Sequence, residues 1–320
     1  EGPVGKSWQL QTTEASTWSL TVSLPSDLAE GSYRLRVHNG FGGGFGWSDS
    51  LPLSVRKRVA WKADVFNVVD QGADPTGKKD STLAVNKALA LAESNRGGIV
   101  FFPRGRYMIS DTLTIPRITT LQGESLELSC IFWKPGQNDK VRNPPATLIR
   151  GTNSFGIKDL ALYSQNYQYA IVGDLGDKPN AEDVFLRRVR VRANLYMGHL
   201  KPEEVDRRFR EFLKLSSGGG DTVRLGGRNI EITDCDFYGA GRAIFLSRVR
   251  DGYVARNTFY NGRWGWYCIS GSDRLIFEKN RIVGADLMAT GGGLNCLDGS
   301  NYSQNIYFAS NTLELMHGWD

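Results

Sequence analysis

The sequence has few of the residues that bind metals or form disulfides, and it lacks a membrane helix. Four cysteines and three histidines occur in 320 residues, and no cysteines have the close pair spacing of a zinc site. No apolar run approaches the roughly 18 residues that a membrane span requires. The chain does not begin with Met and has no basic-then-apolar leader. We therefore expect a secreted protein, extracellular or periplasmic, that has lost any signal peptide and does not insert into a membrane.

The net charge gives only a weak indication of the binding partner. Lys and Arg exceed Asp and Glu by five. This surplus is compatible with an ordinary solvated surface, and it also favours an acidic polymer such as a polyuronate. Arg and Lys are scattered along the strands without a recognised helix or finger motif, so we expect no nucleic-acid partner.

A short phrase recurs through the second half of the chain. In each copy a few alternating apolar residues precede a small polar corner, which is followed by another apolar residue. Taken as equivalent corners, Cys235, Asn257, Asn280 and Asn311 lie 22, 23 and 31 residues apart. A recurring step of this length with strand periodicity predicts one solenoid coil per copy, with corner asparagines stacked in a structural ladder and Cys235 replacing one of them.

The segment before these repeats has a specific local pattern. Residues 65–116 read VFNVVDQGADPTGKKDSTLAVNKALALAESNRGGIVFFPRGRYMISDTLTIP. The pattern predicts a helix from about Thr82 to Ser94, capped by Asp80 or Ser81 and ended by Gly97-Gly98. This segment resembles the N-terminal signature of the pectate-lyase-like superfamily. The resemblance implies a right-handed parallel β-helix whose first open coil is covered by that α-helix, and it transfers no catalytic residue.

We therefore predict an all-β chain with two domains. Residues 1–57 alternate apolar and polar side chains around Gly- and Pro-containing turns, which is typical of a small antiparallel β-sandwich, immunoglobulin-like and incomplete. Residues 58–320 would form the β-helix, with a helical insertion near 200–217. Because the chain ends just after a repeat without a cap, we expect further coils beyond residue 320.

By the same resemblance, a substrate groove would run along the strand that precedes each repeated phrase. Aromatic rings stack on sugars, and Arg and Asn bind hydroxyls or carboxylates. The predicted substrate-binding residues are Arg242, Arg263, Trp264, Trp266, Tyr267, Asn295 and His317. The expected partner is a polysaccharide, because successive coils can contact successive sugar units.

The favoured reaction is hydrolysis of a glycosidic bond by two carboxyl groups. A separation of about 5–5.5 Å favours retention, and one of about 6.5–9.5 Å favours inversion. Asp286 and Asp298 are the predicted pair, with Asp320 as a substitute member. Each of these aspartates could equally form a turn. No cofactor is expected for this reaction.

Two alternatives remain at this stage. A polysaccharide lyase would use Arg248, Arg263, Tyr267 or His317 in β-elimination and could take Ca²⁺, although acidic groups to hold the cation are not obvious. A glycan-binding protein of the adhesin or tail-spike kind would need no catalytic group. The chain has no Asp-Asp pair and no Gly-His-Gly, two marks of polygalacturonase-type hydrolases. Cys268 and Cys296 lie about one coil apart, so they could form a disulfide, but free thiols are favoured.

Overall fold

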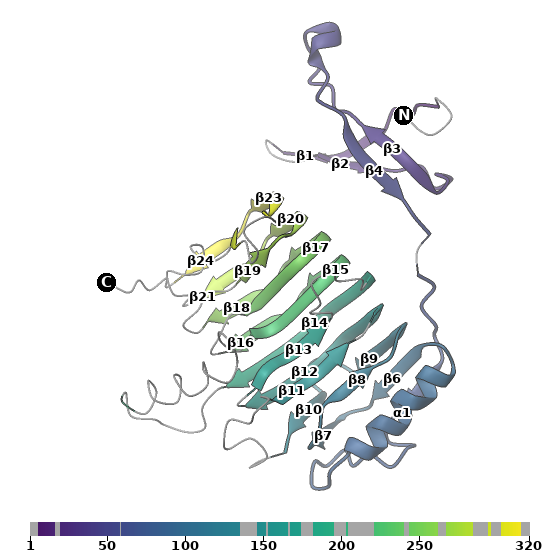
Figure 1. The fold of residues 1–320 in the computed structure, drawn as a ribbon, viewed down its shortest axis with the longest axis vertical. Helices are drawn as coiled ribbons and strands as arrows, with labels where there is room; N and C mark the ends of the chain where they lie inside the picture. The colour runs from purple at the N-terminus through teal and green to yellow at the C-terminus, as the bar shows by residue number, and fades with distance from the viewer. Residues whose placement is uncertain are drawn as a thin grey trace. The chain divides into compact units, whose positions relative to one another are not determined.

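The chain forms two compact units, Glu1–Val59 and Ala60–Asp320. The structure is a computed structural model, shown in Figure 1. It describes residues 6–16, 20–57, 59–134, 146–151, 153–165, 167–173, 182–194, 203, 221–239, 243–261, 267–283, 294–295 and 302–314. The predicted insertion near 200–217 lies outside these residues apart from Glu203.

The N-terminal unit contains two antiparallel strand pairs in its described part. Strand β1 (Gln11–Ala15) pairs with β2 (Leu20–Ser23), and β3 (Gly31–Leu35) pairs with β4 (Leu51–Val55). A short 3-10 helix, η1 (Gly43–Gly46), lies between β3 and β4. Tyr33 is buried and contacts the ring of Trp8. The immunoglobulin-like character of this unit stays a prediction.

The second unit is a right-handed parallel β-helix. Its 20 described strands are hydrogen-bonded into one continuous sheet that winds through three parallel sheets, here called A, B and C, visited along the chain in the order C, A, B. Four long strands bend from one sheet to the next: β12 (Phe155–Gln165) and β14 (Glu182–Asn194) from A to B, and β15 (Asp221–Thr233) and β17 (Ile244–Ala255) from C to A.

Shorter strands complete each sheet. Sheet A adds β5 (Val65–Asn67), β6 (Gly98–Phe102), β9 (Thr119–Gly123), β20 (Asp273–Glu278) and β23 (Gln304–Ala309). Sheet B adds β7 (Gly105–Ile109), β10 (Ser129–Trp133), β16 (Asp236–Gly239), β18 (Thr258–Asn261), β21 (Arg281–Val283) and β24 (Thr312–Glu314). Sheet C adds β8 (Leu113–Ile115), β11 (Ala146–Gly151), β13 (Tyr167–Gly173), β19 (Tyr267–Ser270) and β22 (Leu294–Asn295).

Strand alternation accounts for the core. Every second side chain faces inward, so equivalent positions of successive coils stack about 4.8 Å apart along the axis. Phe237 of β16 stacks on Phe259 of β18 with ring centroids 5.4 Å apart and an interplanar angle of 14°. Phe277 and Phe308 stack in the same way on sheet A. The interior is therefore a continuous apolar column, as the repeated phrase predicts.

Helix α1 (Thr82–Ser94) covers the first coil, which confirms the predicted helix. The Asp80 carboxylate accepts the backbone N–H of Thr82, while Val85 and Leu89 bury their side chains. Gly97 follows the helix with φ 120, and a Cβ there would lie 2.6 Å from the carbonyl oxygen of Ile118. Only glycine fits that helix end.

Candidate functional site

Most of the predicted site residues lie outside the described part of the chain. These are the candidate catalytic residues and most of the candidate sugar contacts: Asp286, Asp298, Asp320, Arg242, Arg263, Trp264, Trp266 and His317. The carboxyl pair therefore stays a prediction, as does the Cys268–Cys296 alternative, because Cys296 is also outside. Tyr267 and Asn295 lie in described strands of sheet C, and Arg248 lies in β17.

The register of sheet C separates Tyr267 from Asn295. Tyr267 pairs with Ile244, which pairs with Val223, and the latter two side chains are fully buried in the core. Asn295 pairs with Ser270, which pairs with Ser247, in the alternate row. Asn295 thus shares a register row with Ser270 and Ser247, whereas Tyr267 shares one with Ile244 and Val223.

Asparagines form a buried ladder at the corner between sheets A and B. Asn257 Oδ1 accepts the backbone N–H of Cys235 at 2.9 Å, and Asn257 Nδ2 donates to the Ile232 carbonyl at 2.9 Å. Asn280 Oδ1 accepts both the backbone N–H and Nδ2 of Asn257, and Asn311 repeats the pattern one coil later. These contacts confirm the predicted ladder and assign it a structural role.

Cys235 begins this ladder as a buried free thiol. Its Sγ lies 3.1 Å from the Thr233 carbonyl oxygen, and burial raises its pKa to about 12. A thiol with this pKa stays protonated and does not act as a nucleophile. Cys235 therefore substitutes for an asparagine in packing, as the repeat predicts.

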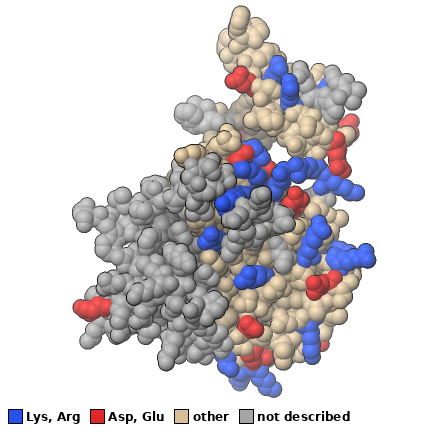
Figure 2. All heavy atoms as spheres, viewed as in Figure 1, with Lys and Arg blue, Asp and Glu red and all other residues tan. Residues whose placement is uncertain are grey.

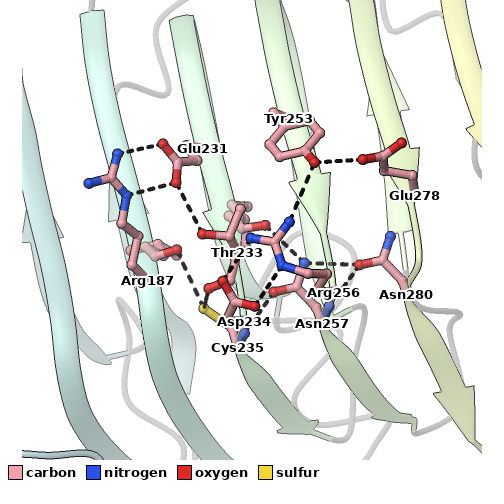
Figure 3. A network of polar contacts seen from close by, with 12 residues as sticks. Arg187, Glu231, Thr233, Asp234, Cys235, Tyr253, Arg256, Asn257, Glu278 and Asn280 are labelled. Atoms are coloured by element: carbon pink, nitrogen blue, oxygen red, sulfur yellow. Dashed lines mark hydrogen bonds and ion pairs between the residues drawn. The ribbon is translucent and has the colours of Figure 1, made fainter. Parts of the chain in front are cut away.

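Charged side chains are paired across neighbouring strands on the outer side of sheet A (Figure 3). Arg187 donates two hydrogen bonds to the Glu231 carboxylate, at 2.7 and 2.5 Å. Tyr253 Oη donates to Glu278 Oε1 at 2.6 Å and accepts from Arg256 Nη1 at 3.5 Å. We call this set the sheet A network.

The pairing keeps these carboxyl groups ionised. Burial opposes the negative charge of Glu231, but the bonds from Arg187 and Thr233 outweigh it, so its pKa lies below the usual value. The bonds from Arg256 lower the pKa of Asp234 at the adjoining corner. A general acid needs a raised pKa. These two carboxyl groups are therefore built to neutralise arginines rather than to protonate a leaving group.

The outer side of sheet B carries a different set of side chains. Tyr163, Arg192, Tyr238 and Tyr260 are aligned in one row, each paired in register with the next, across four successive coils. We call these four residues the tyrosine–arginine row. Sequence reasoning missed it. The available signal was that each residue directly follows an inward apolar residue of its coil: Leu162, Val191, Phe237 or Phe259.

Arginines of β14 converge on one aspartate beside this row. Arg192 donates to Asp236 from Nη1 at 3.1 Å and from Nη2 at 2.7 Å, while Arg190 Nε donates to the same carboxylate at 3.2 Å. The Arg192 guanidinium lies 5.9 Å from the ring centroids of both Tyr238 and Tyr260. Basic and acidic side chains lie among one another on the described part of the face in Figure 2.

Two features are absent from the residues that the structure describes: a membrane-spanning helix and a metal-binding cluster. No helix among these residues is long and apolar enough to cross a membrane. Over the same residues, no cluster of three or more His, Cys, Asp or Glu has the arrangement of a metal site.

Comparisons with known proteins agree with this fold. Residues 65–168 match the family model described as "Rhamnogalacturonase A/epimerase, pectate lyase-like", and residues 212–315 match "Right handed beta helix region". The second unit is thus a right-handed parallel β-helix, and its residues 65–168 are similar to the pectate-lyase-like model.

The individual relatives share less than 30% sequence identity with this chain. A prophage-derived uncharacterized protein of Bacillus subtilis, YomE, is 24% identical over 53% of this chain and 30% of its own length. The mannuronan C5-epimerase AlgE3 of Azotobacter vinelandii is 27% identical over 48% of this chain and 8% of its own length. The surface adhesin PfbA of Streptococcus pneumoniae has a TM-score of 0.51 at 13% identity, covering 78% of this chain and 73% of that one. The chain spans less than a third of either sequence relative, and the adhesin shows the fold alone.

Proposed function

We propose that this protein acts on a polysaccharide outside the cell, as a glycoside hydrolase. Asp286 and Asp298 would supply the two carboxyl groups, with Asp320 as the substitute member. One carboxylic acid would protonate the glycosidic oxygen. The other carboxylate would take a proton from a water that displaces the leaving group at the anomeric carbon, or would attack that carbon to form a glycosyl-enzyme that water then hydrolyses. Either route breaks the glycosidic bond and consumes one water.

The register of sheet C is the observation that carries this proposal. Strands β17, β19 and β22 are stacked in successive coils, with Ser247, Ser270 and Asn295 in one row. In the sequence, Arg263 and Trp264 precede β19, and Asp286 precedes β22. Under the proposal, the candidate sugar contacts and a candidate acid belong to the connections that precede neighbouring strands of one sheet. The match to a model whose description includes rhamnogalacturonase supports the same substrate class.

Glycan binding without cleavage is the second candidate. The pKa values of the Glu231 and Asp234 carboxyl groups lie below their ordinary values, which suits structural carboxylates rather than general acids. The overall likeness to a surface adhesin is compatible with this candidate. Under it, Asp286 and Asp298 would be turn residues.

A cleavage assay separates these candidates. The purified protein is incubated with neutral and acidic polysaccharides, and new reducing ends are measured alongside the ultraviolet absorbance of unsaturated uronates. Hydrolysis predicts reducing ends without that absorbance, and Asp286→Asn or Asp298→Asn should lower the rate by at least about 100-fold. Asp111→Asn, an exposed aspartate of an early coil, should leave it unchanged.

Two results would contradict the hydrolase proposal. Unsaturated products would indicate β-elimination. Binding of a polysaccharide without either signal would indicate a glycan-binding protein.

A further inference from the structure

The tyrosine–arginine row lies on sheet B, apart from the sheet C strands that carry the proposed catalytic groove. We propose that this row binds an acidic oligosaccharide along the β-helix axis. The inference goes beyond the proposed hydrolysis, because the row would hold such a glycan whether or not the protein cleaves it.

The first support is open aromatic surface at regular spacing. Tyr163, Tyr238 and Tyr260 are 41%, 45% and 36% exposed. Tyr238 and Tyr260 occupy adjacent coils, and Tyr163 lies two coils before Tyr238, with Arg192 between them in register. At about 4.8 Å per coil, the row extends about 14 Å along the axis. An extended glycan of several residues can contact each of its rings.

The second support is the orientation of Arg192. The Asp236 carboxylate holds its guanidinium through two hydrogen bonds, and the side chain remains partly exposed. The cation lies 5.9 Å from two tyrosine rings, so its position is set before any ligand arrives. Arginine donates in a planar geometry that matches a carboxylate. A uronate lying on the tyrosines would therefore meet an oriented donor.

Charge on sheet B selects an acidic ligand over a neutral one. The strand segments that lie in sheet B carry four arginines, Arg106, Arg190, Arg192 and Arg281, against two carboxylates, Asp236 and Glu314. Asp236 is bonded by two of those arginines, so that group of three retains a positive charge. This surplus complements a polyuronate.

The same side chains on sheet A do not offer this chemistry. Tyr253 there is bonded to Glu278 and contacted by Arg256. Arg187 is paired one-to-one with Glu231, whereas Arg190 and Arg192 on sheet B share the single carboxylate of Asp236. A ligand on sheet A would have to compete with these contacts. On sheet B, tyrosine surface is already exposed beside an oriented arginine.

The test measures binding by titration calorimetry, with oligogalacturonate and oligomannuronate as probes and their carboxyl-reduced counterparts as neutral controls. The Asp286→Asn, Asp298→Asn double variant serves as the background, so that cleavage does not interfere. Tyr238→Ala should weaken binding by about tenfold or more, as expected for removing an aromatic anchor. Tyr238→Phe keeps the ring and should retain binding. Arg192→Gln should weaken binding of the acidic probes and reduce its dependence on salt.

Matched substitutions elsewhere control for unspecific effects. Tyr302→Ala removes a tyrosine that is 73% exposed and lies off sheet B, and Arg117→Gln removes an exposed positive charge between β8 and β9. Both should leave the affinity for the acidic probes unchanged. Thermal melting verifies that each variant is folded.

Several outcomes would overturn the inference without bearing on hydrolysis. Equal affinity for acidic and carboxyl-reduced probes would contradict the proposed preference for an acidic ligand. Binding that is lost in the Asp286→Asn, Asp298→Asn double variant but intact when Tyr238→Ala is made in the wild-type protein would assign the ligand to the proposed catalytic groove. Three further results would reject a glycan on this row. The first is that neither acidic probe binds, and the second is that a single-stranded oligonucleotide binds more tightly than they do. The third is self-association of the protein that Tyr238→Ala abolishes.

Discussion

Sheets A and B enclose the same apolar column, but their outer sides are chemically different. On sheet A, arginines and carboxylates of adjacent coils bind each other, as Arg187 and Glu231 do. On sheet B, tyrosines of the tyrosine–arginine row stay partly exposed, and arginines outnumber carboxylates. Each coil of a parallel β-helix contributes one outward position to each sheet at a fixed spacing. Successive coils therefore build a separate row of side chains on every sheet.

This difference predicts that substitutions on the two sheets should have different effects on stability and on glycan affinity. Groups whose hydrogen bonds are already made within the protein contribute to stability and gain little from a new ligand. Exposed rings contribute little to folding and gain contact area when a ligand covers them. Substitutions in the sheet A network and its adjoining corner should therefore lower stability at constant glycan affinity. Substitutions of the tyrosines in the tyrosine–arginine row should do the reverse.

The largest expected effect on stability is at the corner between the two sheets. Asn257→Ala removes the acceptor of the Cys235 N–H and the donor to the Ile232 carbonyl, and both partners are buried. Leaving two buried backbone groups without partners should lower the free energy of unfolding by about 2–4 kcal/mol. Urea unfolding of the variant and the wild type measures this difference, provided that a single transition is observed.

Cys235→Ala serves as the control for that corner. It shortens the neighbouring ladder residue but removes only weak sulfur contacts, so its cost should be about 1–2 kcal/mol. Equal effects of the two substitutions would mean that the amide bonds of Asn257 contribute little. In that case the ladder would not be what holds the coils in register.

A smaller effect is expected within the sheet A network. Glu231→Gln keeps the shape of the side chain but removes the charge that binds Arg187. Both side chains are about one-third exposed, so solvent screening limits the loss to about 1 kcal/mol at neutral pH. Affinity for oligogalacturonate should not change, and a change comparable to that of Tyr238→Ala would break the contrast between the sheets.

The pH dependence of the same variant has a definite sign. The pKa of Glu231 in the folded protein lies below its ordinary value of 4.5, so its ion pair contributes stability above that value. The contribution is lost as pH falls through the folded-state pKa. The stability difference between wild type and Glu231→Gln should therefore be largest near neutral pH and shrink in acid. A difference that grows in acid would contradict the assignment.

Much of the fold followed from the sequence because the β-helix is a local, repeated structure. The corner residues Asn257, Asn280 and Asn311 fixed the repeat before any long-range contact was known, and the structure confirms their ladder. Helix α1 was equally predictable, because its cap, apolar stripe and terminal glycines lie within one short segment. Each signal depends on neighbours in one coil or in the next.

The outer surface was less predictable because connections of unequal length separate its members. Tyr163 and Tyr238 share a row because both pair in register with Arg192, one from the coil before it and one from the coil after it. Their spacing in the sequence carries no period, although each follows an inward residue of its strand. For sheet C, the strand register pairs Tyr267 with Ile244, a relation that comes from long-range strand pairing rather than from sequence spacing. Surface sites on a solenoid are therefore best predicted from the alternation of inward and outward side chains along each strand.

The smallest expected effect concerns the exposed pair Asp234–Arg256 at the corner beside the sheet A network. Asp234 has φ 56, a left-handed conformation that asparagine also tolerates, so Asp234→Asn changes the charge with little backbone strain. Both side chains are more than one-third exposed, and solvent screening should limit their coupling to about 0.5 kcal/mol. A double-mutant cycle with Arg256→Gln, measured by urea unfolding at low and high salt, isolates this term. The coupling should fall as salt rises. A salt-independent coupling above about 1 kcal/mol would place this corner among the buried, structure-determining contacts with Asn257.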